Sequence, residues 1–481
     1  MEGRFHTVRA VLAVACAAVL AGACARDEPL GLEDTLVPSF SQSGNWEFND
    51  FHIVSTGASI SRELAERIEA LGGAVERSHP EIGVVITSGL SDDAAADLQG
   101  FGGVTAVVRD ITVQGVPPLE ELEWSTQQLP GKPGKPRRSR KKDAQTAGHD
   151  PTTAFFFPSQ WDMQIIDADD AWNKGFRGSS SVRVAILDTG LDPFHIDMAG
   201  NIDMAASVAF VPSVNGAGPI WGDDNFHGTH VGGTVVTNGI GTSGVAPHTT
   251  LIAVKVCTFL GRCPFSAIIS GLVHAANVNA DVVNMSLGGF IFLFAPGGGQ
   301  LNAALNRAVN FAGQNGTLVV SAAGNSAIDL DHIERDFNLP AVRLTPCENG
   351  NGICISATGP FDALAGYSNF GISAISVAAP GGDFVTTFDP FTSMVLSPCS
   401  TLSVLIPICS GNGFYLFLQG TSMATPHVVG AAALLDAQSA GASNAGQLKT
   451  ALQSTADDLG KQGTDPAYGK GRINVCRLVA C

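Results

Sequence analysis

The chain has 481 residues, of which 45% are apolar and 56 are glycine, and its formal net charge is −17. This length and composition are typical of a folded, loop-rich protein with a large core, and they exclude a disordered chain. Nucleic acid is excluded as an expected partner, because phosphate binding needs clustered Lys and Arg on the folded part.

The N-terminal residues 1–23 read as an export signal. Two arginines precede an uncharged stretch, Ala10 to Ala25, which is too short to cross a bilayer comfortably, and small residues lead to a cleavage point after Ala23. Cys24 follows in LAGAC, which resembles a bacterial lipoprotein box. Residues 24–45 then form a spacer. Two outcomes stay open for Cys24: it is the first residue of a soluble secreted chain, or it is lipidated and tethers the chain to the cell envelope.

Residues 46–116 have the pattern of a small α+β domain. Three strand-like runs, FHIV, IGVVIT and VTAVVRDITVQ, alternate with two helical patterns. The first helix places four apolar residues on one face: Ile60, Leu64, Ile68 and Leu71. Ser91 is a suitable N-cap for the second. This order predicts a split βαβ, ferredoxin-like unit, and an independent binding domain remains an alternative.

Residues 117–152 read as a linker. Seven of the 27 basic residues of the chain lie between Lys132 and Lys142, in a run that is also rich in proline. Such a segment is typical of a solvated, protease-sensitive connection, although it could also bind an acidic surface.

Throughout residues 153–481, Val- and Ile-rich runs alternate with helical patterns. The strand candidates are VRVAIL, LIAVKV, DVVNMS, TLVVSA and AISVAA, and one helix candidate is FSAIISGLVHAANVN. This alternation predicts an α/β fold, with a parallel sheet covered by helices on both faces.

Eight cysteines follow Cys24 as four close couples. An even number in an exported chain suggests disulfides, although eight cysteines allow about 105 connectivities. Our working hypothesis is the sequential pairing: Cys257 with Cys263, Cys347 with Cys354, Cys399 with Cys409, and Cys476 with Cys481. No CxxC or Cys/His spacing suggests structural zinc.

Three motifs each hold a candidate catalytic side chain. VAILDTGLD holds Asp188, NFHGTHVGG holds His227 and GTSMATPHVVGAAALL holds Ser422. A carboxylate, an imidazole and a hydroxyl are the groups needed for acyl transfer to serine. Asp188 follows an apolar strand, which places it at the carboxyl end of a parallel sheet. Ser422 begins an apolar helix, whose positive end stabilises developing negative charge.

Each motif has an alternative interpretation. DTG could belong to an aspartic protease, but the chain has no second such motif, and Leu191 follows the glycine where that family has Ser or Thr. His230 could share a zinc ion with His227, but there is no HExxH pattern, and we expect His230 to be packed and hydrogen-bonded. Taken alone, Ser422 would be a helix N-cap.

The order Asp, His, Ser and further motifs make the chain similar to subtilisin-like serine proteases. The other motifs are DVVNMSLGG at 281–289, LVVSAAGNS at 318–326, GYSNFG at 366–371, SVAAPGG at 376–382 and the closing YGKGRIN. The resemblance covers about residues 155–478. It implies a triad of Asp188, His227 and Ser422, with Asn325 as the oxyanion donor. It also implies that residues 46–116 are an inhibitory propeptide and that the linker is cut or displaced to release the site.

The resemblance further implies a substrate cleft between two short wall segments. One wall is Ser286, Leu287 and Gly288, and the other is Ala322, Ala323 and Gly324. The substrate would pair as an added strand. Because these walls are small and uncharged, we expect an aromatic or long aliphatic P1 residue, the residue before the scissile bond.

The resemblance implies no cofactor for the chemistry, but calcium is common in the family. Four acids crowd an insertion after AGNS: Asp329, Asp331, Glu334 and Asp336. A second, no stronger candidate is the stretch around Asp192 and Asp197. Hard cations bind such oxygen clusters, yet exposed carboxylates are often only solvated, so the metal site stays unassigned.

These observations predict an exported serine endopeptidase that acts on polypeptides and is made as a propeptide-inhibited zymogen. Two alternatives stay open. One is a catalytically silent relative that only binds, and the other is a protease with one narrow processing target rather than a broad specificity.

Overall fold

The computed structural model describes residues 47–57, 60–130 and 150–481. The expected export signal, Cys24 and the basic run between Lys132 and Lys142 lie outside these ranges. Within them, no helix is both long enough and apolar enough to cross a membrane.

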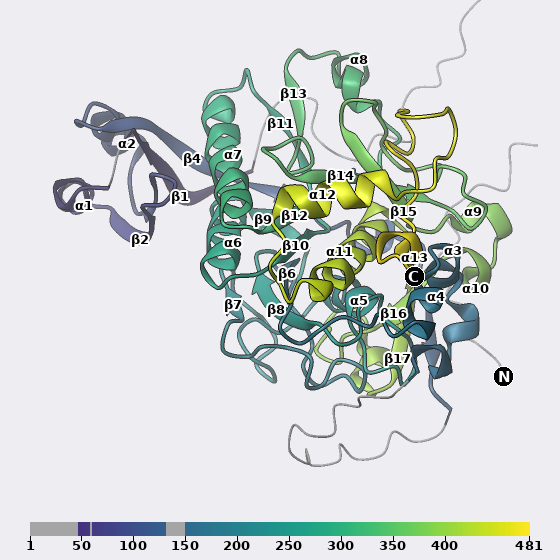
Figure 1. Cartoon of the computed structure of the whole chain (residues 1–481). Helices are drawn as coiled ribbons and strands as arrows, with labels where there is room; N and C mark the ends of the chain where they lie inside the picture. The colour runs from purple at the N-terminus through teal and green to yellow at the C-terminus, as the bar shows by residue number, and fades with distance from the viewer. Residues whose placement is uncertain (1–46, 58–59, 131–149) are drawn as a thin grey trace, which may run out of the picture. The chain divides into compact units, whose positions relative to one another are not determined.

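A seven-stranded sheet forms the centre of residues 150–481 (Figure 1). Its order is β15-β14-β12-β10-β6-β8-β7, and all paired neighbours run parallel. The strands are β6 (Arg183–Asp188), β7 (Val208–Ala209), β8 (Thr250–Lys255), β10 (Val282–Met285), β12 (Leu318–Ala322), β14 (Ile353–Thr358) and β15 (Ile375–Pro380). The Val- and Ile-rich runs of the sequence lie in this sheet, and the predicted parallel sheet is confirmed.

Helices cover both faces of the sheet (Figure 1). One face carries α6 (Phe265–Asn277) and α7 (Gly298–Gln314), and the other carries α5 (His227–Val235), α11 (Thr421–Gln438) and α12 (Ala445–Ser454). Successive residues of β6 point to opposite faces of the sheet. Val184 packs in the core with α11, and Ala185 packs in the core with α6 and α7. The shorter helices are α3 (Trp161–Ile165), α4 (Ala168–Asn173), α8 (Ile333–Phe337), α9 (Phe384–Thr387), α10 (Pro390–Ser393) and α13 (Val475–Leu478).

Residues 47–116, called the N-terminal region below, form an antiparallel sheet with two helices. The elements are β1 (Glu47–Thr56), α1 (Arg62–Ala70), β2 (Ala74–His79), β3 (Val84–Ser88), α2 (Asp92–Gln99) and β4 (Val104–Gln114). The sequence predicted three strands here and missed β2, because this edge strand is largely exposed and lacks an apolar alternation. The sheet order is β2-β3-β1-β4-β9, so that β9 (Arg262–Pro264) joins it from the C-terminal part.

Buried polar contacts connect the N-terminal region with α6. The carboxylate of Asp110, which is fully buried, accepts hydrogen bonds from the backbone N–H groups of Ser266 (3.1 Å) and Ile111 (2.9 Å). Burial raises the pKa of Asp110 to about 6. His79 Nε2 and Ser270 Oγ lie 2.9 Å apart.

Part of the expected linker is structured. Residues Leu119–Glu121 form a 3-10 turn, and β5 (Ser125–Gln128) pairs antiparallel with β17 (Phe414–Leu418), which in turn pairs with β16 (Val395–Pro398). Residues 119–121 and 125–128 of the expected linker are therefore ordered. The sequence STQQ has no apolar alternation, and its order comes from hydrogen bonds to a buried strand that lies almost 300 positions away.

An antiparallel pair, β11 (Gly289–Phe292) with β13 (Val342–Thr345), lies next to the sheet and packs its own apolar cluster. The sequential pairing of the cysteines is confirmed in all four couples.

Candidate active site

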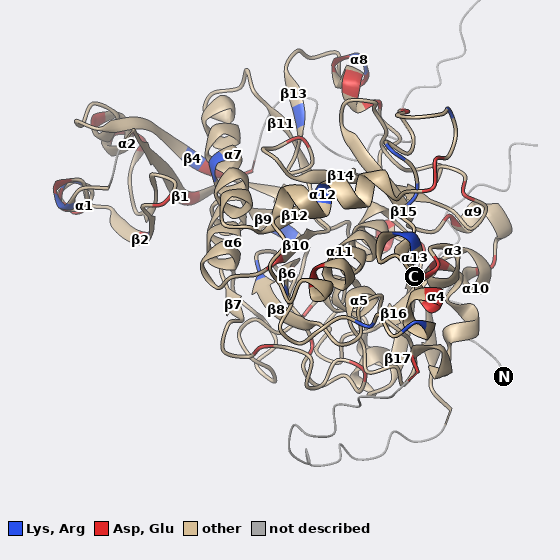
Figure 2. Cartoon of the chain, in the orientation of Figure 1, with Lys and Arg blue, Asp and Glu red and all other residues tan. Residues whose placement is uncertain are grey.

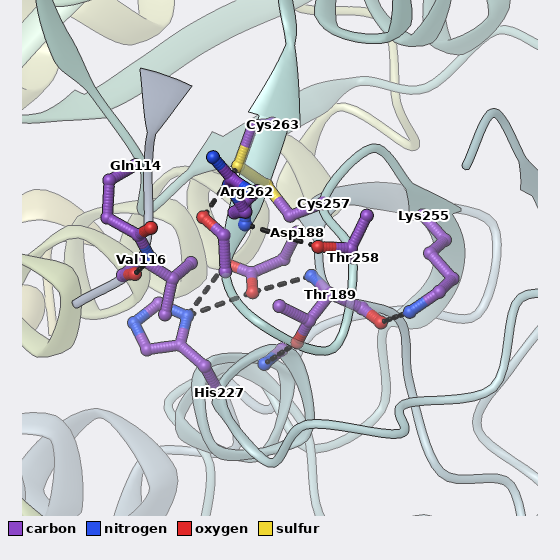
Figure 3. The surroundings of a disulfide bond; sticks show 12 residues. Gln114, Val116, Asp188, Thr189, His227, Lys255, Cys257, Thr258, Arg262 and Cys263 are labelled. Atoms are coloured by element: carbon purple, nitrogen blue, oxygen red, sulfur yellow. Dashed lines mark hydrogen bonds and ion pairs between the residues drawn. A yellow bond between two sulfur atoms is a disulfide. The ribbon is translucent and has the colours of Figure 1, made fainter. Parts of the chain in front are cut away.

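Asp188 and His227 form a buried pair. Asp188 ends β6 and His227 begins α5, so the carboxyl end of the strand meets the first turn of the helix. His227 Nδ1 lies 2.9 and 3.0 Å from the two carboxylate oxygens of Asp188 (Figure 3). The side chains are 2% and 0% exposed. This contact requires the proton of a neutral His227 on Nδ1, which leaves Nε2 as the basic nitrogen.

Ser422 lies in the first turn of α11 and is 6% exposed. Its hydroxyl donates to the carbonyl oxygen of Ser286 at 3.1 Å, and the Ser286 hydroxyl donates to the Ser422 carbonyl at 2.7 Å. One small cavity, of about 10 Å³, is lined by Pro117, Leu122, His227, Asn325, Leu418, Gln419, Ser422 and Met423. The structure therefore brings His227, Asn325 and Ser422 together, although their motifs lie about 100 residues apart.

Asn325 follows the carboxyl end of β12 and is oriented by Thr421. Its side-chain oxygen accepts from the Thr421 backbone N–H at 2.9 Å and from the Thr421 hydroxyl at 2.8 Å. This places the amide nitrogen, which can only donate, at the other end of the side chain.

A buried polar cluster that the sequence analysis missed supports the pair of Asp188 and His227. The Thr189 hydroxyl donates to Asp223 at 2.8 Å and accepts from the Gly228 N–H at 3.0 Å, so it connects the residues that follow Asp188 and His227. Burial raises the pKa of Asp223 to about 6.

The same cluster contains a fully buried ion pair. Lys255 Nζ lies 2.7 Å from Asp224 Oδ1, and both side chains are 0% exposed. Lys255 also donates to the carbonyl of Thr189 (Figure 3). The signal in the sequence was the pair of acids in DDNFHGT, since two adjacent carboxylates before a buried helix need partners.

His230 is packed and hydrogen-bonded as predicted. Its Nε2 lies 2.9 Å from the carbonyl of Leu416 and 3.2 Å from that of Val395. Burial and the neighbouring His227 lower the pKa of His230 to about 3, so the ring is neutral.

The two expected cleft walls leave the carboxyl ends of neighbouring parallel strands. Ser286–Gly288 follow β10, and 322–324 close β12 and begin the turn to Asn325. Ser286 and Leu287 are buried and Gly288 is half-buried.

The chain's own residues 112–117 run along the first wall. β4 pairs with β9, with Gln114 opposite Arg262. The N–H groups of Gly115 and Val116 then donate to the carbonyl of Gly261 at 3.0 and 3.1 Å, and the Gly288 N–H donates to the Gly115 carbonyl at 3.4 Å. Val116 is fully buried, and the next residue, Pro117, lines the small cavity that His227 and Ser422 share.

The acidic residues considered for calcium do not converge. Asp331 accepts from the N–H groups of Ile372 and Ser373, and Asp329 accepts from that of Asp331, while Glu334 and Asp336 lie on α8 (Figure 2). Within the described ranges, no group of three or more His, Cys, Asp or Glu residues could hold a metal ion.

Asp192 and Asp197 contact protein donors. Asp197 accepts from three backbone N–H groups, of residues 240–242, and from the Tyr415 hydroxyl at 2.6 Å. Asp192 accepts from the N–H of Phe194 and from the N–H and hydroxyl of Thr401. Lys and Arg lie scattered over many elements rather than on one face (Figure 2).

Comparison with known proteins gives one family. A model of the subtilase family matches residues 179–471. Thermitase of Thermoactinomyces vulgaris is 33% identical over 332 residues, which are 68% of this chain and 99% of that protein. Subtilisin BL of Lederbergia lenta is 37% identical over 316 residues, which are 65% of this chain and 96% of that protein. The crystal structure of the epidermin leader peptide processing serine protease of Staphylococcus aureus has the same fold, with a TM-score of 0.68 at 21% identity, over 89% of this chain and 97% of that one.

Proposed function

The chain belongs to the subtilase family of serine endopeptidases, and on this premise we propose that Ser422 is its nucleophile, activated by the buried pair of His227 and Asp188. The observation that carries this proposal is the contact of His227 Nδ1 with both oxygens of Asp188, in a histidine that shares a cavity with Ser422.

The geometry supports the usual order of acyl-transfer steps. His227 Nε2 takes the proton from Ser422 Oγ as that oxygen attacks the substrate carbonyl, and Asp188 stabilises the imidazolium that forms. The Asn325 amide and the Ser422 N–H donate to the resulting oxyanion. His227 then gives its proton to the leaving amine, and a water molecule, activated by the same histidine, hydrolyses the acyl-enzyme.

We propose that the N-terminal region with residues 117–128 inhibits the enzyme in the same chain. In this proposal residues 114–116 take the strand position of a substrate, and an antiparallel register continued from the Gly288–Gly115 hydrogen bond would bring Pro117 opposite Ser286. A substrate residue at that position would donate its N–H to the Ser286 carbonyl, but proline has none. The Ser422 hydroxyl donates to this carbonyl instead, so it is held away from its attacking role.

Labelling with a fluorophosphonate tests both parts of the proposal. The active enzyme should be modified at Ser422, and Ser422→Ala should not be modified at all. The intact chain should react slowly, and Asp110→Ala should react faster, because it loses the acceptor that caps α6 at Ser266. Asp97→Ala, an exposed acid on α2, is the matched control and should react like the parent. Equal labelling of all three intact chains would contradict the inhibitory role, and no labelling of any form would contradict the catalytic one.

We also propose that the protein is exported and cuts polypeptides broadly, with an apolar P1 residue. Unfolded casein should be degraded to many fragments. A protease with one processing target would leave casein intact, and mass spectrometry of the non-reduced, mature protein would identify the new N-terminus and any lipid on Cys24.

A further inference from the structure

Leu344 lies between the two walls of the expected P1 pocket. A Cβ atom built on Gly288 would lie 3.8 Å from Leu344 Cδ1, and one built on Gly324 would lie 3.5 Å from Leu344 Cδ2. One methyl group of Leu344 therefore faces each wall. The expectation of a large P1 residue considered only the walls, and Leu344 belongs to neither of them in the sequence.

The strand register places Leu344 on the side of the cleft that receives the P1 side chain. In an antiparallel pair of strands, the side chains of directly opposite residues point to the same face of the sheet. Side chains two positions apart in one strand also share a face. Gly288, in the wall expected to bracket the P1 side chain, and Phe290 are two positions apart, so a Gly288 Cβ would point to the same face as the Phe290 side chain. Leu344 lies opposite Phe290 in the pairing of β11 with β13, on that same face. A P1 side chain thus enters the space that Leu344 closes.

Leu344 is held firmly in this position. It is 3% exposed and packs in an apolar cluster with Phe290 and Ala323. Its backbone N–H donates to Glu348 Oε2 at 2.7 Å, and its carbonyl accepts from the Glu348 N–H at 3.0 Å. Because both the side chain and the backbone are fixed, a large P1 group cannot push Leu344 aside without disturbing this cluster.

We propose that Leu344 forms the floor of the P1 pocket and restricts cleavage to bonds that follow a small, uncharged residue, alanine above all. The proposal rests on the catalytic role of Ser422 proposed above. It replaces the expectation of an aromatic or long aliphatic P1 residue, while keeping the apolar preference.

The test compares kcat/KM for a series of peptides that differ only at P1, with Ala, Val, Leu and Phe, using enzyme recovered from expression of the full chain. Active sites are counted with a fluorophosphonate, so the comparison does not depend on the fraction of folded enzyme. The parent should cleave after Ala at least about 10-fold faster than after Phe, and Leu344→Ala should raise the ratio of Phe to Ala about 10- to 100-fold.

Two further variants separate pocket size from stability. Leu344→Val removes a smaller volume and should raise only the rate after Leu. Leu330→Ala removes the same volume from the same apolar cluster, and its P1 profile should equal that of the parent, because no contact places Leu330 at Gly288 or Gly324. If Ser422 is still labelled, either of two results would overturn the role of Leu344. One is a parent that cleaves faster after Phe than after Ala, and the other is a ratio of Phe to Ala cleavage that both Leu344 variants leave unchanged. Absence of both labelling and cleavage would overturn the proposed function as well.

Discussion

Replacing Lys255 should strongly destabilise the fold, because it leaves a buried charge without its partner. At 2.7 Å, two unit charges attract by about 6 kcal/mol when the effective dielectric constant is about 20. Desolvation of both groups offsets most of this attraction, so the pair adds little overall. Loss of one partner alone typically costs about 3–5 kcal/mol.

We therefore expect Lys255→Met to lower the free energy of unfolding by about 3–5 kcal/mol. Asp224 would keep the Val214 N–H and the Ser213 hydroxyl as donors but would lose its only cation at hydrogen-bond distance among the described residues. In Lys255→Met/Asp224→Asn neither charge of the pair remains, and most of the loss should be recovered.

Urea denaturation measures these changes, with all variants made in Ser422→Ala so that self-digestion does not interfere. The matched control is Arg62→Met, which breaks an exposed ion pair with Glu66 on α1 and should leave the midpoint unchanged. The reasoning fails if Lys255→Met stays within about 1 kcal/mol of its parent, or if the double variant is no more stable than the single one.

Three other changes probe the site. Asn325→Ala should lower kcat about 10²- to 10³-fold with little change in KM, as peptide hydrolysis would measure, since the amide acts on the oxyanion and not on the bound substrate. Asp223 has its pKa raised by burial to about 6, so the stability that its protonated form contributes is present at low pH and lost as the pH rises through about 6. Asp223→Asn should therefore gain about 2 kcal/mol relative to its parent between about pH 4 and pH 7 in urea titrations, and an equal pH dependence of both would contradict this. EDTA should leave the melting temperature unchanged, because Asp192 and Asp197 are satisfied by protein N–H and O–H donors; a fall of several degrees would indicate a bound cation.

The sequence predicted the parts of the fold and site that local patterns encode. Apolar runs marked most strands of the parallel sheet, and the carboxyl end of one such run placed Asp188 at the edge where α/β sheets hold their sites. The features that the sequence analysis missed depend on contacts between residues that lie far apart in the sequence. β5 is a strand only because β17 offers hydrogen bonds, and Lys255 looks like the polar end of a strand until Asp224 is placed beside it.

The proposed P1 pocket shows the same limit. Its walls are contiguous motifs, whereas its floor comes from β13, and the pairing of that strand with β11 has no signature in either segment. Glycines 288 and 324 therefore suggested open space that a leucine from elsewhere occupies.

If the N-terminal region leaves the enzyme, as proposed above, the short strand β9 loses its partner β4. Its backbone would then be an uncovered sheet edge, the kind of surface that promotes aggregation. The strand has only three residues, ends at Pro264, and contains Cys263, whose disulfide with Cys257 closes a small loop. So short a strand can pair with one extended peptide but offers too few hydrogen bonds to recruit another sheet, so the proposed protease would keep a peptide-binding edge without a strand long enough to aggregate.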